Sequence, residues 1–346
     1  MSVLYNFSAL DLALTALTAV SLPTYTLLVW VLARQRANPK LSGSFFLLCG
    51  CLGVADVAST LIRYAMHRAP MWGLGARLVF LPSARWLAVA VSCVDLPILV
   101  AENVMVLLVA LNRATAIALP TRYGRIWSRE NTWRAVCAIV AMSTFAAPVG
   151  IFYTRPVYYT VDNVTAHMAY AKPTELVFGL ALLTGSFGTL SAISYAIAVA
   201  HVIGHNWTRR HNAAVASGAH EQKQNDAIEL RLSICGFTFF LTQALLAWSY
   251  AGFLLRLFDY ETGYDLWLVA MDLFCYINPY SLLLTSKETR RQFAFALACN
   301  AADSASAAVV PVSVPMRAFD KPHSRDKPHD KPRDKPGDKP QARTAV

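Results

Sequence analysis

The feature that most constrains this chain is a series of seven apolar segments, each about as long as a helix that crosses a hydrocarbon layer of about 30 Å. Only 15% of the 346 residues are charged and 55% are hydrophobic, whereas about 25% are charged in an average soluble domain. The sequence therefore predicts an all-α membrane protein with a seven-transmembrane helix bundle. The expected spans are residues 10–33, 45–64, 86–111, 135–153, 176–203, 230–255 and 266–284.

The charges between the spans predict how the bundle is oriented. The loops after spans one, three and five hold 3 + 5 + 4 = 12 Lys and Arg, and the loops after spans two, four and six hold 3 + 2 + 1 = 6. Because positive charge is retained in the cytoplasm, residues 1–9 are expected outside and the C-terminus inside the cell membrane. The excess charge of +10 lies in loops and tail, so we interpret it as topology and expect no nucleic-acid partner.

The ends of the chain carry modification signals that fit this orientation. The sequons at Asn6 and Asn163 fall outside and are candidate glycosylation sites, whereas the sequon at Asn206 falls inside. The tail 1–9 has no basic residue, which argues against a cleaved signal peptide. After the seven-transmembrane domain, 10–285, basic and apolar residues alternate over 286–299 at helical spacing, which predicts a short amphipathic helix on the inner leaflet.

The chain beyond this amphipathic helix changes in composition. Cys299 is either a lipidation site or an unmodified thiol. Residues 300–346 contain the triplet Asp-Lys-Pro five times, and proline and charge together predict a disordered cytoplasmic tail. The repeat predicts no function by itself.

The third span combines apolar length with three ionisable groups. Asp95, Glu102 and Arg113 are separated by seven and eleven residues, about two and three helical turns, so they are expected on one face. Ionisable groups inside a membrane are costly and therefore face a bundle interior or a cavity. They either pair internally or take part in signalling, and Arg113 lies where the apolar run stops.

Several residues occur in the order and on the spans typical of a known receptor class. They are Asn112-Arg113 with Ile117 and Pro120 after span three, Leu52 with Asp56 in span two, Asn278-Pro279 in span seven, and the amphipathic segment after Leu284. This pattern resembles rhodopsin-like G-protein-coupled receptors. Asn112 in place of an acid, the short N-terminal tail and Trp127 in the second inner loop are most similar to nematode chemosensory serpentine receptors of the Srg and Srv type.

The resemblance implies a heterotrimeric G protein as partner, contacted at Asn112, Arg113, Ile117 and Pro120. The alternative for Arg113 is that it only marks the membrane edge. Because Asn112 supplies no carboxylate beside Arg113, we expect some basal activity. The usual disulfide to the third span is missing, since no cysteine lies between 154 and 175, and no proline breaks span five or six.

The resemblance also groups Asp56, Glu102 and Asn278 around a sodium ion. Two carboxylates close together in low dielectric do not both stay ionised without a cation or a proton. We therefore expect Na⁺ or a shared proton there, with a structural polar network as the alternative. No other cofactor or metal is expected, because the seven cysteines show no metal-ligand spacing.

Asp95 lies five turns before Arg113, where amine receptors of this class hold a ligand ammonium. Arg63 and Arg85 are alternative partners of this carboxylate, and a small apolar volatile is the alternative ligand. The aromatic side chains of Trp248, Tyr250 and Tyr276 are candidate pocket residues, although aromatic residues in membrane spans also simply pack.

Other functions fit the sequence less well than a chemosensory receptor. An opsin requires a bundle lysine, and no lysine lies between 223 and 287. A multispan transporter is the alternative, but we find no internal repeat. An enzyme is not expected, because no Ser–His pair or HExxH motif accompanies Asp56 and Glu102.

Overall fold

The computed structural model describes residues 9–34, 43–73, 85–149, 156–160, 166–170, 173–212, 219–258 and 260–307. The chain divides into two units, Met1–Ala301 and Ala302–Val346, and the first holds the helix bundle. The expected glycosylation sites Asn6 and Asn163 and the repeats after residue 307 lie outside the described residues. The expected lipidation site Cys299 is described only as a helical backbone position.

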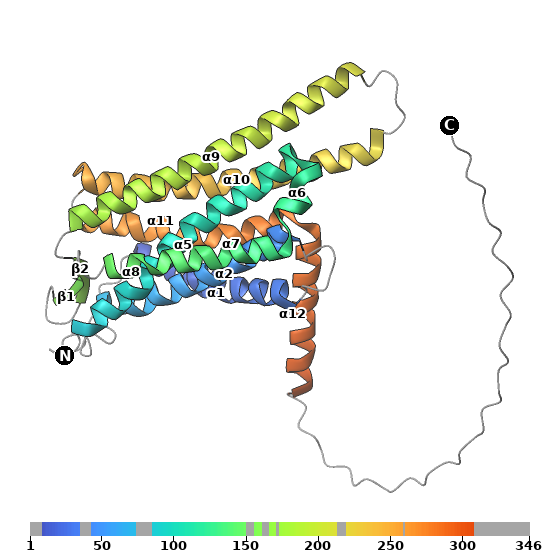
Figure 1. The fold of residues 1–346 in the computed structure, drawn as a ribbon. Helices are drawn as coiled ribbons and strands as arrows, with labels where there is room; N and C mark the ends of the chain where they lie inside the picture. The colour runs from blue at the N-terminus through green and yellow to red at the C-terminus, as the bar shows by residue number, and fades with distance from the viewer. Residues whose placement is uncertain are drawn as a thin grey trace, which may run out of the picture. The chain divides into compact units, whose positions relative to one another are not determined.

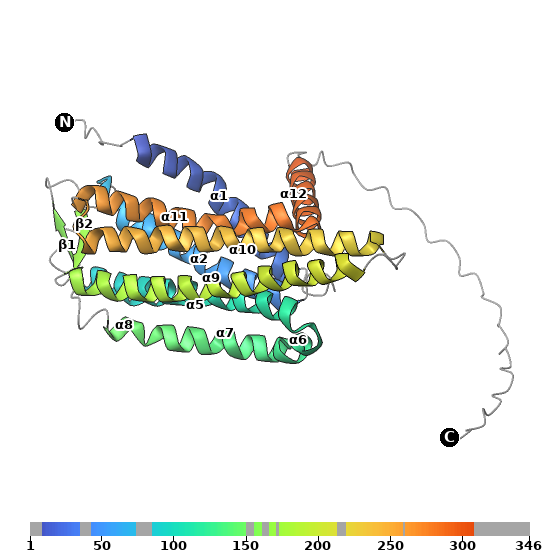
Figure 2. The ribbon, with the colours of Figure 1, turned by 90° about the horizontal axis from the view of Figure 1, so that it is seen from above.

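Long helices dominate the first unit, and they run side by side as a bundle (Figures 1 and 2). Six of them are long and apolar enough to cross a membrane within the described part of the chain. They are α1 (Ala9–Arg34), α2 (Ser44–Arg63, continued to Met71), α5 (Arg85–Ala118), α9 (Pro173–Asn212), α10 (Ala219–Leu254) and α11 (Tyr260–Thr285).

The fourth expected span is interrupted. Helix α7 covers Arg129–Thr144, and α8 covers Ala146–Val149 after a break at Phe145. Pro148 explains the break, because it cannot donate a hydrogen bond to the carbonyl of Thr144, four residues earlier, and its ring crowds that carbonyl. Helix α7 has 16 residues, fewer than the about 20 that cross a hydrocarbon core, and α7 and α8 together take the place of the fourth span.

Helix α2 ends in a wide turn. Residues Tyr64–Arg68 form a π-helix, η2, which is followed by α3 (Ala69–Met71) and by Gly73 at φ 77°. Pro70 has no N–H for the carbonyl of Met66, and the wider i→i+5 turn immediately precedes it. Residues five apart lie nearly one above the other in such a turn, so Arg68 comes round to the same side as Arg63.

A small β-hairpin departs from the all-α expectation. Strands β1 (Pro156–Thr160) and β2 (Ala166–Tyr170) pair antiparallel, with Pro156 opposite Tyr170 and Thr160 opposite Ala166. The sequence predicts only a polar loop here. The hairpin lies at the end of the bundle where α9 begins and α10 ends (Figure 1).

At the opposite end, α9 and α10 extend past α5 and α11 (Figures 1 and 2). Their 40 and 36 residues correspond to about 60 and 54 Å at 1.5 Å per residue, about twice a hydrocarbon core. The short helix α6 (Pro120–Ile126) follows α5 at this end. Helix α12 (Lys287–Ala307) begins directly after Ser286, whose Oγ accepts the N–H of Thr289 over 3.2 Å and caps the helix.

Candidate functional site

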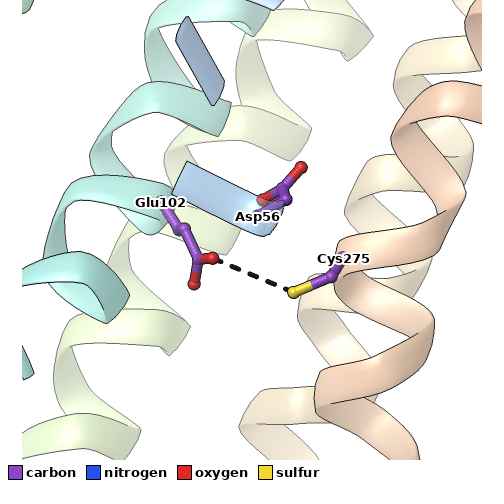
Figure 3. A group of neighbouring side chains, drawn as sticks. All are labelled: Asp56, Glu102 and Cys275. Atoms are coloured by element: carbon purple, nitrogen blue, oxygen red, sulfur yellow. Dashed lines mark hydrogen bonds between the residues drawn. The ribbon is translucent and has the colours of Figure 1, made fainter. Parts of the chain in front are cut away.

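Two carboxyl groups and a thiol meet in the middle of the bundle. Asp56 on α2, Glu102 on α5 and Cys275 on α11 are all buried, and one ligand atom from each lies within 4.8 Å of the others (Figure 3). The Cys275 thiol donates to Oε1 of Glu102 over 3.8 Å. Among the described residues Oε2 of Glu102 has no hydrogen-bond partner. The expected Asp56–Glu102 pair is thus brought together, with a cysteine that the sequence analysis did not include.

Asp56 is held by side chains from α1 and α11. The hydroxyl of Tyr25, on α1, donates to Oδ2 of Asp56, and the amide of Asn278, on α11, donates to the same oxygen over 3.3 Å and to the Tyr25 hydroxyl. Asn278 therefore takes its expected place in this group, and Tyr25 is a member that no motif indicated. A phenol reaching an intramembrane aspartate could have been inferred only from the packing of α1 on α2.

Gly53 makes that packing close. A methyl group on Gly53 would lie 2.7 Å from Cγ2 of Val29 and 2.9 Å from Cε2 of Tyr25. Only a residue without a side chain allows α1 to approach α2 in this way. Gly53 lies three residues before Asp56, so the close approach lets the Tyr25 hydroxyl reach the carboxylate.

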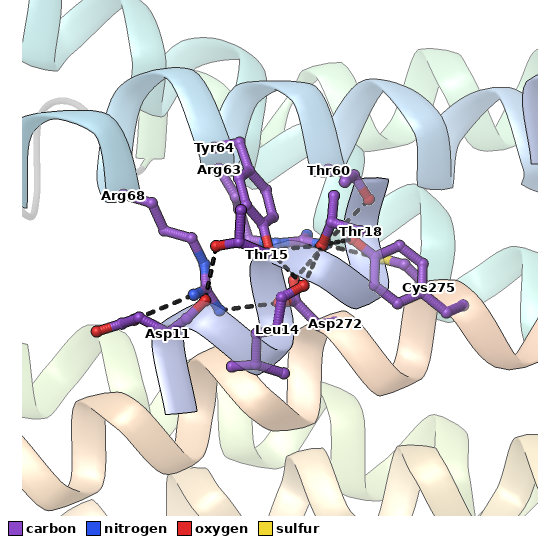
Figure 4. A network of polar contacts seen from close by, with 11 residues as sticks. Asp11, Leu14, Thr15, Thr18, Thr60, Arg63, Tyr64, Arg68, Asp272 and Cys275 are labelled. Carbon is purple, nitrogen blue, oxygen red and sulfur yellow. Dashed lines mark hydrogen bonds and ion pairs between the residues drawn. The ribbon is translucent and has the colours of Figure 1, made fainter. Parts of the chain in front are cut away.

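A second group joins two buried arginines to one carboxylate (Figure 4). Nη2 of Arg68 lies 2.8 Å from Oδ2 of Asp272, and Nη2 of Arg63 lies 3.7 Å from Oδ1. Arg68 also lies 3.3 Å from Asp11, at the start of α1, and over the ring of Tyr64. Asp272 and Arg68 were not among the residues expected to form a site. A charged residue within an apolar span, as Asp272 is six residues before Asn278, was the feature of the sequence that could have indicated it.

Arg63 links the two groups. Its Nη2 donates to Sγ of Cys275 over 3.1 Å, and its Nη1 donates to Oγ of Ser59, one turn earlier on α2. Figure 4 shows the Arg63 side chain between Asp272 and Cys275. Arg63 was an expected partner of Asp95, but in the structure it contacts Asp272 and Cys275 instead.

Asp95 has a histidine beside it. Nε2 of His67 lies 3.8 Å from Oδ2 of Asp95, and Nδ1 lies 3.4 Å from the hydroxyl of Tyr264. The ring of Trp267 lies against His67 and donates its Nε1–H to the hydroxyl of Tyr250 over 3.1 Å. These five residues, from η2, α5, α10 and α11, are called the Asp95 group below. The side chain of Arg85, the other expected partner of Asp95, lies outside the described residues.

The three aromatic residues expected to line a ligand pocket lie in different surroundings. Tyr250 is buried in the Asp95 group. Tyr276 is buried as well, but its hydroxyl bonds Thr18 on α1 over 2.6 Å. Trp248 is 55% exposed on α10 and is not part of the Asp95 group. Two residues along a helix rotate a side chain by about 200°, so Trp248 and Tyr250 cannot face the same side.

The end of α5 that carries Arg113 is fastened to neighbouring segments. The amide of Asn112 donates to Oγ of Ser44 over 3.0 Å, and its carbonyl accepts the hydroxyl of Tyr123 over 3.3 Å. Trp127 donates Nε1–H to Oγ1 of Thr115 over 2.5 Å, so α6 and its end are tied back to α5. Ile117 is half-buried near the end of α5, and Pro120 is exposed as the first residue of α6.

Arg113 lies on an aromatic ring. Its guanidinium carbon is 3.2 Å from the ring centroid of Phe45, the second residue of α2, which is a cation–π contact. Asn112 and Arg113 thus bind adjacent residues of α2, Ser44 and Phe45. The Arg113 side chain is half-buried at this position.

The donor set in Figure 3 fits a sodium ion poorly. Hard cations take oxygen ligands, and the third corner of the group is the sulfur of Cys275. Oδ2 of Asp56 already accepts two donors, and Oγ of Ser59 accepts Arg63. Within this group, Oε2 of Glu102 and Oδ1 of Asn278 are buried oxygens that have no hydrogen-bond partner among the described residues.

Two comparisons with known proteins bear on this arrangement. The chain matches the family described as serpentine type 7TM GPCR chemoreceptor Srv over residues 14–299, well over half of its length. A comparison with curated proteins finds no matching relative. The matched range includes both buried groups, the Asp95 group and the Arg113 end of α5, and it supports a receptor over the transporter alternative.

Proposed function

Since the chain belongs to the serpentine 7TM GPCR chemoreceptor family of the Srv type, we propose that it binds a small extracellular ligand at the Asp95 group and activates a heterotrimeric G protein at the Arg113 end of α5. As a family member it is a multi-pass membrane protein and a chemoreceptor. The proposal adds where the ligand binds, where the G protein docks and which way the chain is oriented.

The observation that carries the proposal is the distribution of ionisable groups along α5. Asp95, 14% exposed, lies toward one end beside His67, which contacts Tyr264 and Trp267. Glu102 is fully buried in the middle of α5, and Arg113 is half-buried toward the other end. A partly accessible carboxylate next to aromatic faces suits a protonated amine, through charge and cation–π attraction. A small apolar volatile is the alternative ligand and uses only the aromatic faces.

The opposite end supports the coupling part of the proposal. Helices α9 and α10 extend beyond the other helices there, and α6 lies at the same end (Figure 1). The basic segments 112–134 and 203–231 include α6 and the extended ends of α9 and α10, so the positive-inside rule supports this end as the cytoplasmic one. We propose that Asn112, Arg113, Ile117 and Pro120 border the G-protein contact.

G-protein nucleotide exchange in membranes containing the full chain tests this proposal. Wild type is measured against a panel of small amines and neutral volatiles, together with Arg113→Ala and Asp95→Asn at matched surface expression. We expect Arg113→Ala to abolish exchange, and Asp95→Asn to abolish only the responses to amines. Arg134→Ala is the matched control for a lost arginine, because Arg134 is 70% exposed and pairs only with Glu130 among the described residues.

Each outcome tests a separate part of the proposal: the coupling site, the ligand site or the receptor function. Exchange that persists in Arg113→Ala would contradict the proposed coupling site. Amine responses that survive in Asp95→Asn would contradict the ligand site, and responses to neutral volatiles alone would assign the apolar class of ligand. Absence of exchange with every G protein, despite normal surface expression, would contradict the receptor function as a whole.

A further inference from the structure

The resemblance to rhodopsin-like receptors predicts a sodium ion between the carboxylates of Asp56 and Glu102. The geometry points to a different source of positive charge. Five charged side chains are almost completely buried in the two adjoining groups: the acids Asp56, Glu102 and Asp272, and the bases Arg63 and Arg68. Each arginine is attached to α2 or η2 and cannot leave. The buried carboxylates therefore have fixed cations as neighbours before any ion binds.

Arg63 is the one of these cations that reaches the Asp56–Glu102–Cys275 group. Its Nη2 lies 3.1 Å from Sγ of Cys275, and that thiol in turn donates to Glu102. Its Nη1 donates a hydrogen bond to Oγ of Ser59, a hydroxyl on α2 between Asp56 and Arg63. Arg68 instead contacts Asp272 and Asp11, farther along the same helix.

A metal ion bound by the three ligand atoms would lie close to this guanidinium. With a metal–sulfur distance of about 2.3 Å and the 3.1 Å from Sγ to Nη2, the separation is roughly 5–6 Å at most. At an effective dielectric constant of about 20, repulsion between two unit charges at that distance weakens binding about a hundredfold. The sulfur corner adds a further disadvantage for a hard cation.

We propose that Arg63 is a tethered cation that takes the place of a sodium ion in this group, so that the protein does not bind sodium there. A single proton shared by Asp56 and Glu102 then balances the three carboxyl groups against the two guanidinium groups. This role of Arg63 depends on the geometry of the buried groups and is independent of the ligand and the G protein. It is therefore tested by thermal unfolding and not by signalling.

The experiment is a thermal unfolding series of the purified full chain in detergent, in sodium chloride and in N-methyl-D-glucamine chloride at equal concentrations. We expect wild type to unfold at the same temperature in both salts. We expect Arg63→Gln to gain a saturable rise of a few degrees that is specific to sodium, as a ligand bound only to the folded state produces. Arg63→Lys, which keeps a cation, is expected to behave as wild type.

Arg68→Gln is the matched control, because it removes an equally buried arginine that does not contact Cys275. It is expected to lower the unfolding temperature equally in both salts. A sodium-specific rise in wild type that Asp56→Asn abolishes would overturn the proposal, and this comparison does not depend on whether Arg63→Gln folds. A folded Arg63→Gln without any sodium-specific rise would overturn it as well.

Discussion

Arg68 and Asp272 form a buried ion pair, with 2.8 Å between Nη2 and Oδ2, that joins the π turn at the end of α2 to α11. Asp272 also lies 3.7 Å from Arg63, so one carboxylate serves two buried guanidinium groups. Asp272 lies in the expected seventh span, and Arg68 lies in the helical segment Ser44–Met71, which is long and apolar enough to cross a membrane. Uncompensated charge is more costly there than in a soluble domain.

Asp272→Asn is expected to lower the stability strongly, because it leaves two buried arginines without their shared carboxylate. Removing one partner of a buried ion pair typically costs about 3–5 kcal/mol. The measurement is the unfolding temperature in detergent together with surface expression. Asp11→Asn is the matched control, with a smaller expected loss because the Asp11 side chain is 19% exposed; equal losses would contradict this interpretation.

Gly53→Ala is expected to destabilise the α1–α2 contact, while Gly50→Ala is expected to be neutral or slightly stabilising. The added methyl group at position 53 meets Val29 at 2.7 Å, whereas at position 50 its nearest neighbour is Cβ of Leu32 at 3.9 Å. Overpacking costs about 1–3 kcal/mol, and Gly to Ala gains up to about 1 kcal/mol in an unhindered helix. Opposite shifts of unfolding temperature in the two variants are the expected result, and similar shifts would argue against a close contact at Gly53.

Phe45→Leu is expected to raise basal nucleotide exchange. It removes the ring against which Arg113 lies, at 3.2 Å from its centroid, while keeping an apolar side chain. A cation–π contact contributes about 0.5–2 kcal/mol, so the equilibrium that holds Arg113 in place should shift by roughly 2-fold to 30-fold. Phe46→Leu is the control, since Phe46 packs edge-on against Phe45; equal basal exchange in the two variants would contradict a restraining role for the Phe45 ring.

Asn112→Asp is expected to lower basal exchange. The substitution places a carboxylate beside Arg113 and retains an oxygen that can accept the Tyr123 hydroxyl, while it loses the amide that donates to Ser44. The measurement is exchange without ligand at matched surface expression. Asn112→Ala separates the new charge from the lost amide, because it also loses the bond to Ser44. Unchanged basal exchange in Asn112→Asp would show that the missing acid does not set basal activity.

Much of this arrangement could be predicted from residue order alone. Apolar length predicts the spans, because the cost of exposing backbone and polar groups to lipid is a property of each segment by itself. Seven-residue and eleven-residue spacing on the third span places Glu102 inside, and Asp56 and Asn278 come together as the receptor motifs imply. The family match over residues 14–299 agrees with the predicted receptor class.

The tertiary structure decided which polar groups meet. The rotation and approach of one helix on another set these contacts: Gly53 allows Tyr25 to reach Asp56, and the π turn before Pro70 brings Arg68 round to Asp272. The length of an apolar segment determines that the helix lies in the membrane. Side-chain contacts of a few ångströms depend instead on packing between segments that are far apart in the chain. The spacing of residues within one segment does not encode that packing.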